Sequence, residues 1–248
     1  MRKLFWLVVL LGLLAAIVVA SFPARMAVRL AMPDNSPVQL EEVSGSIWTG
    51  RAGRILYQGV DQGALSWRVH PRALLQRQID VTVGLEGTQL DGVARLVRQG
   101  EQIHVSDARF TLPATRLEPL LDIPALHLTG QVRVELDDLR LQNRVPTSLK
   151  GSAVWNDAGV TGADAAAFGT LVASFGPLPG GGFGGEVSDQ GGPLSLEGYF
   201  NTTLFGYEAE AILQARDGNA QVTRALRHIG QLQADGSVVY SLKGGLGQ

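Results

Sequence analysis

The sequence predicts a mainly β protein, in which a single N-terminal transmembrane helix precedes a curved antiparallel β-meander domain with a few short helices. Three observations support this fold class. Residues 4–20 form an uncharged apolar run, apolar and polar residues alternate along much of the remaining chain, and helical periodicity is confined to short segments. Alternation with a period of two is typical of antiparallel strands that have one buried and one solvated face.

The apolar run is long enough to cross a bilayer. As a helix, its 17 residues span roughly 26 Å, close to a hydrocarbon core of about 30 Å. Because Arg2 and Lys3 precede the run, we expect residues 1–3 to be cytoplasmic, residues 4–22 to form the anchor, and the rest to be exported. A signal peptide cleaved after Val18-Val19-Ala20 is the alternative interpretation. The residues assigned to the membrane anchor include Leu4, Phe5, Trp6, Leu10, Leu14, Ile17 and Ala20.

The composition restricts both the cellular compartment in which the protein is expected and the chemistry that its side chains can perform. The chain has no cysteine and a net charge of −2. Disulfides, thiolate nucleophiles and thiolate metal ligands are therefore excluded, and a nucleic-acid-binding surface is not indicated. An exported domain that is held by its core alone is typical of the bacterial periplasm. We therefore expect a protein of the bacterial inner membrane whose bulk lies in the periplasm.

A stalk at residues 23–37 is expected to lead into one periplasmic β-rich domain at residues 38–248. Three stretches show the alternation most clearly: Leu65, Trp67 and Val69; Ile79, Val81, Val83 and Leu85; Val132, Val134 and Leu136. Asp137-Asp138 interrupts the third stretch and predicts a bulge or tight turn. Asp91-Gly92 and Asp235-Gly236 predict hairpin turns.

Helical signals are few. Pro71 opens a short helical segment at residues 72–76, and Thr115 with Glu118 resembles a capping box that starts another. The clearest helix covers residues 221–229, where apolar residues follow helical spacing. Residues 176–193 hold eight glycines and three prolines, so we expect a mobile loop there.

No motif in the chain indicates catalytic, cofactor-binding or metal-binding residues. Gly180, Gly182 and Gly185 match a dinucleotide-binding pattern, but no strand leads into them and no helix follows. The four histidines, His70, His104, His127 and His228, have no metal-ligand spacing, and a solvated sheet face explains His104 and His127. We therefore expect a protein that is not an enzyme and has no cofactor.

Several segments, taken in order, resemble the N component of the bacterial type II secretion system, the general secretion pathway protein N family. They are residues 44–52 (SGSIWTGRA), 65–67 (LSW), 71–75 (PRALL), 149–155 (LKGSAVW) and 191–194 (GGPL), followed by Asp235-Gly236 ahead of Tyr240. The residues that carry the resemblance, or form core positions within it, are Gly45, Trp48, Gly50, Trp67, Gly151, Trp155 and Gly192. Trp67 is in phase with apolar neighbours and is expected to be a core residue.

The resemblance implies a non-enzymatic inner-membrane accessory subunit of the machine that exports folded periplasmic proteins across the outer membrane. Its expected partners are other inner-membrane and periplasmic subunits of the apparatus, together with the membrane but not nucleic acid. The alternative is a lipid-binding or lipid-transfer envelope protein, because the meander and its repeated apolar-x-glycine units also resemble AsmA-like periplasmic proteins. An open apolar trough along the sheet would favour the lipid-handling alternative, whereas helices that close the apolar face would favour the subunit.

Overall fold

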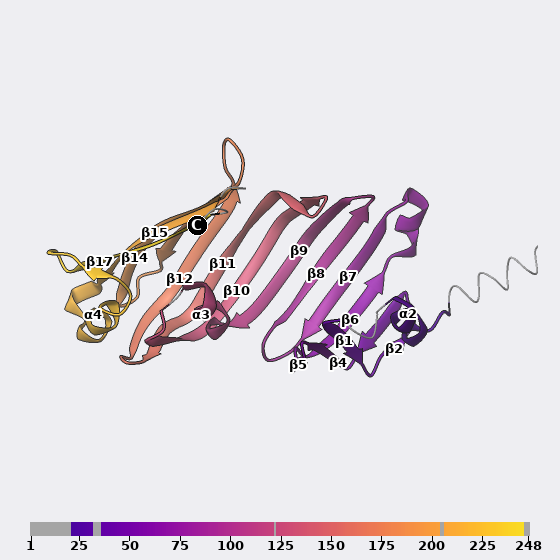
Figure 1. Cartoon of the computed structure of the whole chain (residues 1–248), viewed down its shortest axis with the longest axis horizontal. Coiled ribbons are helices and arrows are strands. Elements are labelled where there is room, and N and C mark those ends of the chain that lie inside the picture. Colours follow the sequence, from indigo (N-terminus) through magenta and orange to yellow (C-terminus); the bar gives the residue numbers. More distant parts are fainter. Residues whose placement is uncertain (1–20, 32–35, 122, 204–205, 246–248) are drawn as a thin grey trace, which may run out of the picture. The chain divides into compact units, whose positions relative to one another are not determined.

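The computed structural model describes residues 21–31, 36–121, 123–203 and 206–245 (Figure 1). The anchor residues assigned above, from Leu4 to Ala20, lie outside the described part of the chain. Among the described residues, no helix has the length and apolar character needed to cross a bilayer. The chain divides into two compact units, Met1–Gly100 and Glu101–Gln248. We call them the N-terminal unit and the C-terminal unit.

In its described residues, the N-terminal unit contains two antiparallel sheets and two short helical segments. The larger sheet has the strand order β2-β3-β6-β7-β8, and the smaller has the order β1-β4-β5. The elements are α2 (Ala24–Ala31), β1 (Val38–Glu41), β2 (Ser44–Gly45), β3 (Thr49–Ala52), β4 (Arg54–Tyr57), β5 (Val60–Asp61), β6 (Ala64–Val69), the 3-10 helix η1 (Pro71–Gln76), β7 (Ile79–Glu86) and β8 (Asp91–Gln99).

The segment predicted as a stalk contains helix α2, which packs onto the N-terminal unit. Ala24 is 1% exposed and belongs to a small core with Val43 and Ala52, against which Val28 and Trp67 also pack. Apolar contacts on one face of α2 therefore hold this part of the predicted stalk against the sheet.

Trp67 occupies the core position that its strand phase predicts. It lies opposite Gly50 on β3, where a Cβ atom would overlap the indole ring. The indole Nε1 donates a hydrogen bond to the Ser46 carbonyl at 3.3 Å. The absence of a side chain at Gly50 is what lets the ring approach the strand this closely.

The prediction of a hairpin turn at Asp91-Gly92 is wrong. Asp91 begins β8, and Gly92 pairs with Leu85, so the connection lies at residues 87–90. The reason is the alternation of apolar residues in the two strands, which pairs Val83 with Ala94. This pairing sets the register, and the register places the turn before the local turn signal.

The C-terminal unit is an antiparallel meander in which each strand from β9 to β15 pairs with the next (Figure 1). The strand order is β9-β10-β11-β12-β13-β14-β15-β17-β16. The elements are β9 (Gln102–Pro113), η2 (Ala114–Leu117), α3 (Glu118–Leu121), β10 (Leu126–Gln142), β11 (Val145–Gly162), β12 (Ala166–Pro177), β13 (Phe183–Asp189), β14 (Leu194–Thr203), β15 (Gly206–Ala215), η3 (Arg216–Gly218), α4 (Ala220–Leu226), β16 (Gln231–Leu232) and β17 (Ser237–Gly245). The prediction of a mainly β antiparallel fold with few short helices is confirmed.

Several local predictions for this unit are also confirmed. The register of β10 against β11 shifts between Leu136 and Asp138, as the predicted bulge requires. Gly236 has a φ of +84° in the turn before β17. Helix α4 (Ala220–Leu226) overlaps the predicted range of 221–229 and begins one residue earlier. The Asn219 side chain caps it by accepting hydrogen bonds from the N–H groups of Gln221 and Val222.

Two other predictions for this unit are wrong in part. The predicted loop at residues 176–193 contains strand β13, because β12 and β14 both supply hydrogen-bonding partners to its glycine-rich backbone. The capping box at Thr115 and Glu118 does not form, since η2 has no side-chain cap. Instead, Glu118 Oε1 accepts a hydrogen bond of 2.8 Å from the Leu128 N–H.

Candidate functional site

One face of the C-terminal sheet is built from apolar residues that the strand register places in rows. One row runs through Leu112, Val132, Trp155 and Leu171 on four successive strands. Leu196 and Leu213 lie opposite each other on β14 and β15, and Val238 follows on β17. Since successive residues of a strand point to opposite faces, these rows define the inner face of the sheet.

A second row on the same face carries mostly small residues. It consists of Val134, Ala153, Ala173, Val187, Gly198, Ala211 and Tyr240, each opposite the next. The small side chains beside the row of larger ones leave space above the sheet surface. The structure has a cavity of about 310 Å³ here, open on one side to solvent.

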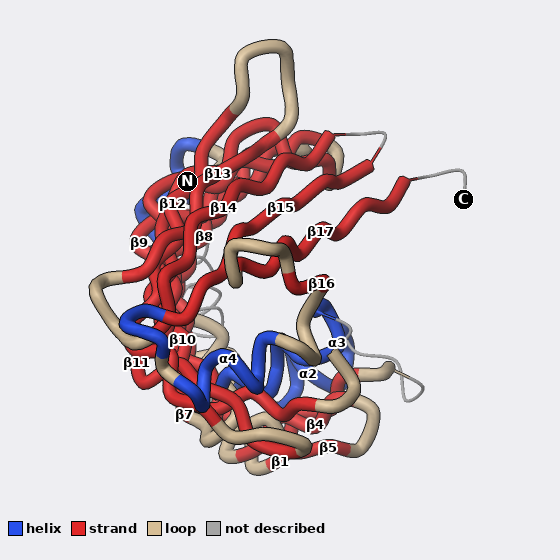
Figure 2. Tube along the Cα trace, turned by 90° about the vertical axis from the view of Figure 1, so that its left-hand side faces the viewer, coloured by secondary structure: helices blue, strands red, loops and turns tan. Residues whose placement is uncertain are grey.

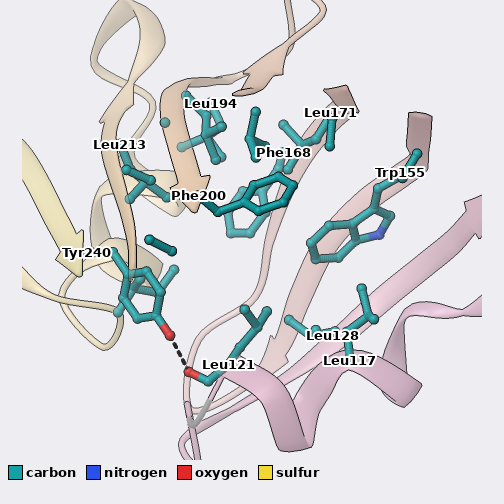
Figure 3. A pocket seen from close by; sticks show the side chains of 18 of the residues that line it. Leu117, Leu121, Leu128, Trp155, Phe168, Leu171, Leu194, Phe200, Leu213 and Tyr240 are labelled. Atoms are coloured by element: carbon teal, nitrogen blue, oxygen red, sulfur yellow. Dashed lines mark hydrogen bonds between the residues drawn. The ribbon is translucent and has the colours of Figure 1, made fainter. Parts of the chain in front are cut away.

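Helical segments border the cavity on the inner face. Leu117 and Leu121, from η2 and α3, line one side, and α4 buries Val222 and Leu226 in the adjoining core. Figure 2 shows α3 and α4 on the same side of the sheet. The Tyr240 hydroxyl donates a hydrogen bond to the Leu121 carbonyl at 2.6 Å and so ties β17 to α3 (Figure 3).

The cavity surface is apolar. Figure 3 shows leucine, phenylalanine and tryptophan side chains directed into it from β10, β11, β12, β14 and β15. The polar atoms nearby already have partners, because Trp155 Nε1 donates to the Thr129 carbonyl at 2.8 Å and Tyr240 donates to Leu121. Glu210 lies between Ala209 and Ala211, so strand alternation directs its side chain to the opposite face. The site can hold an apolar group, and none of the described side chains is directed into it as an acid, base or nucleophile.

A polar cluster lies at the end of β13. Asp189 Oδ1 accepts hydrogen bonds from the Gly191 N–H and from Arg216 Nη2, both at 2.8 Å, and Oδ2 accepts one from the Leu196 N–H at 2.9 Å. Burial alone would raise the pKa of this carboxyl group, but the hydrogen bonds from Leu196, Arg216 and Gly191 lower the pKa to about 2. Arg216 also donates to the Gly192 carbonyl, so the cluster fixes the turn between β13 and β14.

Each histidine lies beside a carboxylate from a different segment. The distances are 3.4 Å for His70–Asp80, 2.9 Å for His104–Asp138, 3.7 Å for His127–Glu118 and 2.8 Å for His228–Asp164. His104 and His127 are partly exposed, in line with the solvated face that the sequence predicts. In the part of the chain that the structure describes, no three His, Asp or Glu side chains are grouped so as to hold a metal ion.

The structure does not gather the residues of the sequence resemblance into one site. Gly45, Trp48, Gly50 and Trp67 belong to the N-terminal unit, whereas Gly151, Trp155 and Gly192 belong to the C-terminal unit. Only Trp155 of these lines the cavity. A Cβ atom at Gly192 would overlap the Phe168 carbonyl, so close backbone approach explains that glycine.

Sequence reasoning raised an open apolar trough as one alternative but did not locate the cavity or its lining residues, and it missed the Asp189 cluster. The sequence signal for the cluster was an aspartate two residues before a Gly-Gly-Pro turn, which is a turn-forming pattern. The cavity has no local signal, because its small residues, Ala153, Ala173, Gly198 and Ala211, come from four different strands.

Comparisons with known proteins agree with one another. A family model described as "Type II secretion system (T2SS), protein N" matches residues 36–241. A type II secretion system protein N of Vibrio cholerae serotype O1 is 27% identical over 164 residues, which cover 64% of this chain and 64% of the relative. A protein of the same name from Aeromonas hydrophila is 30% identical over 159 residues, covering 62% of this chain and 60% of the relative. The chain thus spans less than two thirds of either relative, and no solved structure matches it.

Proposed function

The chain belongs to the type II secretion system protein N family, and from this premise we propose that it is a non-enzymatic accessory subunit of that secretion system in the inner membrane. The observation that carries the proposal is the match of the family model to residues 36–241, which draws on both units. In this proposal residues 1–3 are cytoplasmic, residues 4–22 cross the membrane once, and the remainder is periplasmic. The subunit takes part in the export of folded periplasmic proteins across the outer membrane.

The partners in this proposal are other subunits of the apparatus, reached through the outer surfaces of the two units. The apolar inner face of the C-terminal unit is partly covered by its own helices. Exposed apolar side chains on the outer faces of the strands, such as Tyr199 and Ile212, are better placed for protein contacts.

Site-specific photo-cross-linking tests the proposed partnership. A photoreactive amino acid at Trp48, Tyr199 or Ile212 of the full chain is expected to give cross-links to secretion subunits in membranes that contain the complete apparatus. The same variants in cells without the other secretion genes are the control and are expected to lose these products. Failure to recover any secretion subunit from all three positions would contradict the proposal.

A second function, hydrocarbon binding, is favoured by the open apolar cavity of about 310 Å³. Dry apolar cavities of roughly half this size bind small hydrocarbons in other proteins. A peptide in the same place would bury backbone N–H and C=O groups without partners, whereas an acyl chain has no such groups. The segments η2 and α3 border the cavity through Leu117 and Leu121 and do not fill it, so this alternative retains support.

Filling the cavity tests hydrocarbon binding. Ala211 lies on its floor opposite Gly198, and Ala211→Phe is expected to occupy the space. In membranes that contain a photoactivatable fatty acid, the wild-type chain should be labelled on peptides that hold Leu121, Leu213 or Tyr240, and Ala211→Phe should lose this label. Ala167→Phe places the same ring at an exposed position of β12 and should keep it. Equal labelling of all three proteins at these peptides, or labelling confined to residues 4–22, would contradict the idea.

A further inference from the structure

Helix α2 presents an unusual outward face. Its inward face is closed by Ala24 and Val28, which pack on the core of the N-terminal unit. The outward face carries Met26, which is 57% exposed, and Leu30, which is 82% exposed, one helical turn apart. Arg25 and Arg29 are exposed beside them at the same spacing. Apolar and basic side chains thus share one surface of a helix whose other surface is already packed.

The position of α2 in the chain restricts where it can lie. The apolar run ends at Ala20 and the helix begins at Ala24, so their Cα atoms are at most about 14 Å apart. The headgroup layer on each side of a bilayer is roughly 5–8 Å thick. If residues 4–22 span the membrane, α2 remains within about one helix diameter of the headgroups.

We propose that α2 lies in the membrane interface and binds an anionic phospholipid surface. Met26 and Leu30 enter the boundary between headgroups and acyl chains, and the Arg29 guanidinium contacts headgroup phosphates. Arg25 contributes less, because its Nε already donates to the Val43 carbonyl. The proposal rests on the proposed membrane anchoring and adds a second contact that sets the N-terminal unit against the bilayer.

The positive charge of the helix favours binding to an anionic membrane surface over binding to an apolar protein partner. In α2, arginine is the only charged residue type, and acidic residues are absent from its first turn. Each arginine near an anionic bilayer strengthens binding by about fivefold. The attraction is expected to weaken as salt is added, whereas insertion of Met26 and Leu30 is expected to persist.

Single-cysteine labelling tests the proposal cleanly, because the chain has no cysteine of its own. Full-length M26C, L30C, L14C and I212C variants are each labelled with an environment-sensitive fluorophore. They are reconstituted into vesicles of phosphatidylcholine alone or mixed with phosphatidylglycerol. Nitroxide-bearing lipids quench labels in the bilayer, and iodide quenches labels in water. We expect lipid quenching at positions 26 and 30 and iodide quenching at position 212.

Arg29→Gln provides the electrostatic arm of the test. In phosphatidylglycerol vesicles it should reduce the ratio of inserted to free helix about fivefold, and in pure phosphatidylcholine it should change little. Lipid quenching at position 14 together with iodide quenching at positions 26 and 30 would leave the anchor in place and overturn the interfacial helix. Iodide quenching at position 14 would overturn both the anchor and the proposal that rests on it. An equal effect of Arg29→Gln in both vesicles would overturn the phosphate contact.

Discussion

Replacing Asp189 with asparagine is expected to lower the free energy of unfolding of the C-terminal unit by about 3 kcal/mol. The side chain is only 10% exposed and accepts three hydrogen bonds, one of them from Arg216. Asparagine has one acceptor oxygen where aspartate has two. Its NH2 group must therefore face an N–H donor that bonded to a carboxylate oxygen before. The substitution also leaves the Arg216 guanidinium without its countercharge.

The same carboxylate makes stability depend on pH. Its pKa is about 2 in the folded chain and near 3.8 in the unfolded chain. Above about pH 5 the group is ionised in both states, and its contribution of about 2 kcal/mol is fully present. As the pH falls from about 5 to about 2, the unfolded state takes up the proton first, so this contribution is progressively lost.

Urea denaturation of the full chain, followed by circular dichroism at several pH values, measures both effects. Asp189→Asn should lower the midpoint at neutral pH and reduce the loss of stability between about pH 5 and about pH 2. Asp137→Asn makes the same chemical change at an exposed position on β10 and should stay within about 0.5 kcal/mol of the wild type. Equal midpoints and equal acid sensitivity for Asp189→Asn and the wild type would contradict the assigned role of the cluster.

Features set by local periodicity were predictable from the sequence. Alternation identified Trp67, Val132 and Val134 as inward residues, and the structure places each of them against a core. The same reasoning predicted the bulge at Asp138, because an extra residue there shifts the phase. These predictions succeed because a strand has the same alternation wherever it lies in the fold.

Features set by distant strands were not predictable. The glycines of β13 indicate a loop by composition, but pairing on both sides holds Gly184 and Gly185 in the sheet. The cavity depends on Ala153, Ala173 and Ala211, which are brought together only by the register of the intervening strands. When the pairing of the strands is not known, the sequence does not show which small residues face one another.

A pair of neighbouring residues on β15 provides the sharpest test of which face is buried. Leu213 is 6% exposed and lines the cavity, whereas Ile212 is 51% exposed on the opposite face. The two side chains are isomers, so truncation to alanine removes the same number of carbon atoms. Leu213→Ala is expected to lower the free energy of unfolding by about 3 kcal/mol, through lost burial and an enlarged void.

Ile212→Ala is expected to change the free energy of unfolding by less than about 1 kcal/mol, because half of that side chain is already in water. Urea titration of both full-length variants beside the wild type gives the comparison directly. If the two substitutions cost the same, or Ile212 costs more, the inner face has been assigned to the wrong side of the sheet. The cavity would then lose its lining, and hydrocarbon binding would lose its structural basis. A large difference in the expected direction fixes the face that any hydrocarbon chain must reach and leaves the opposite face free for protein partners.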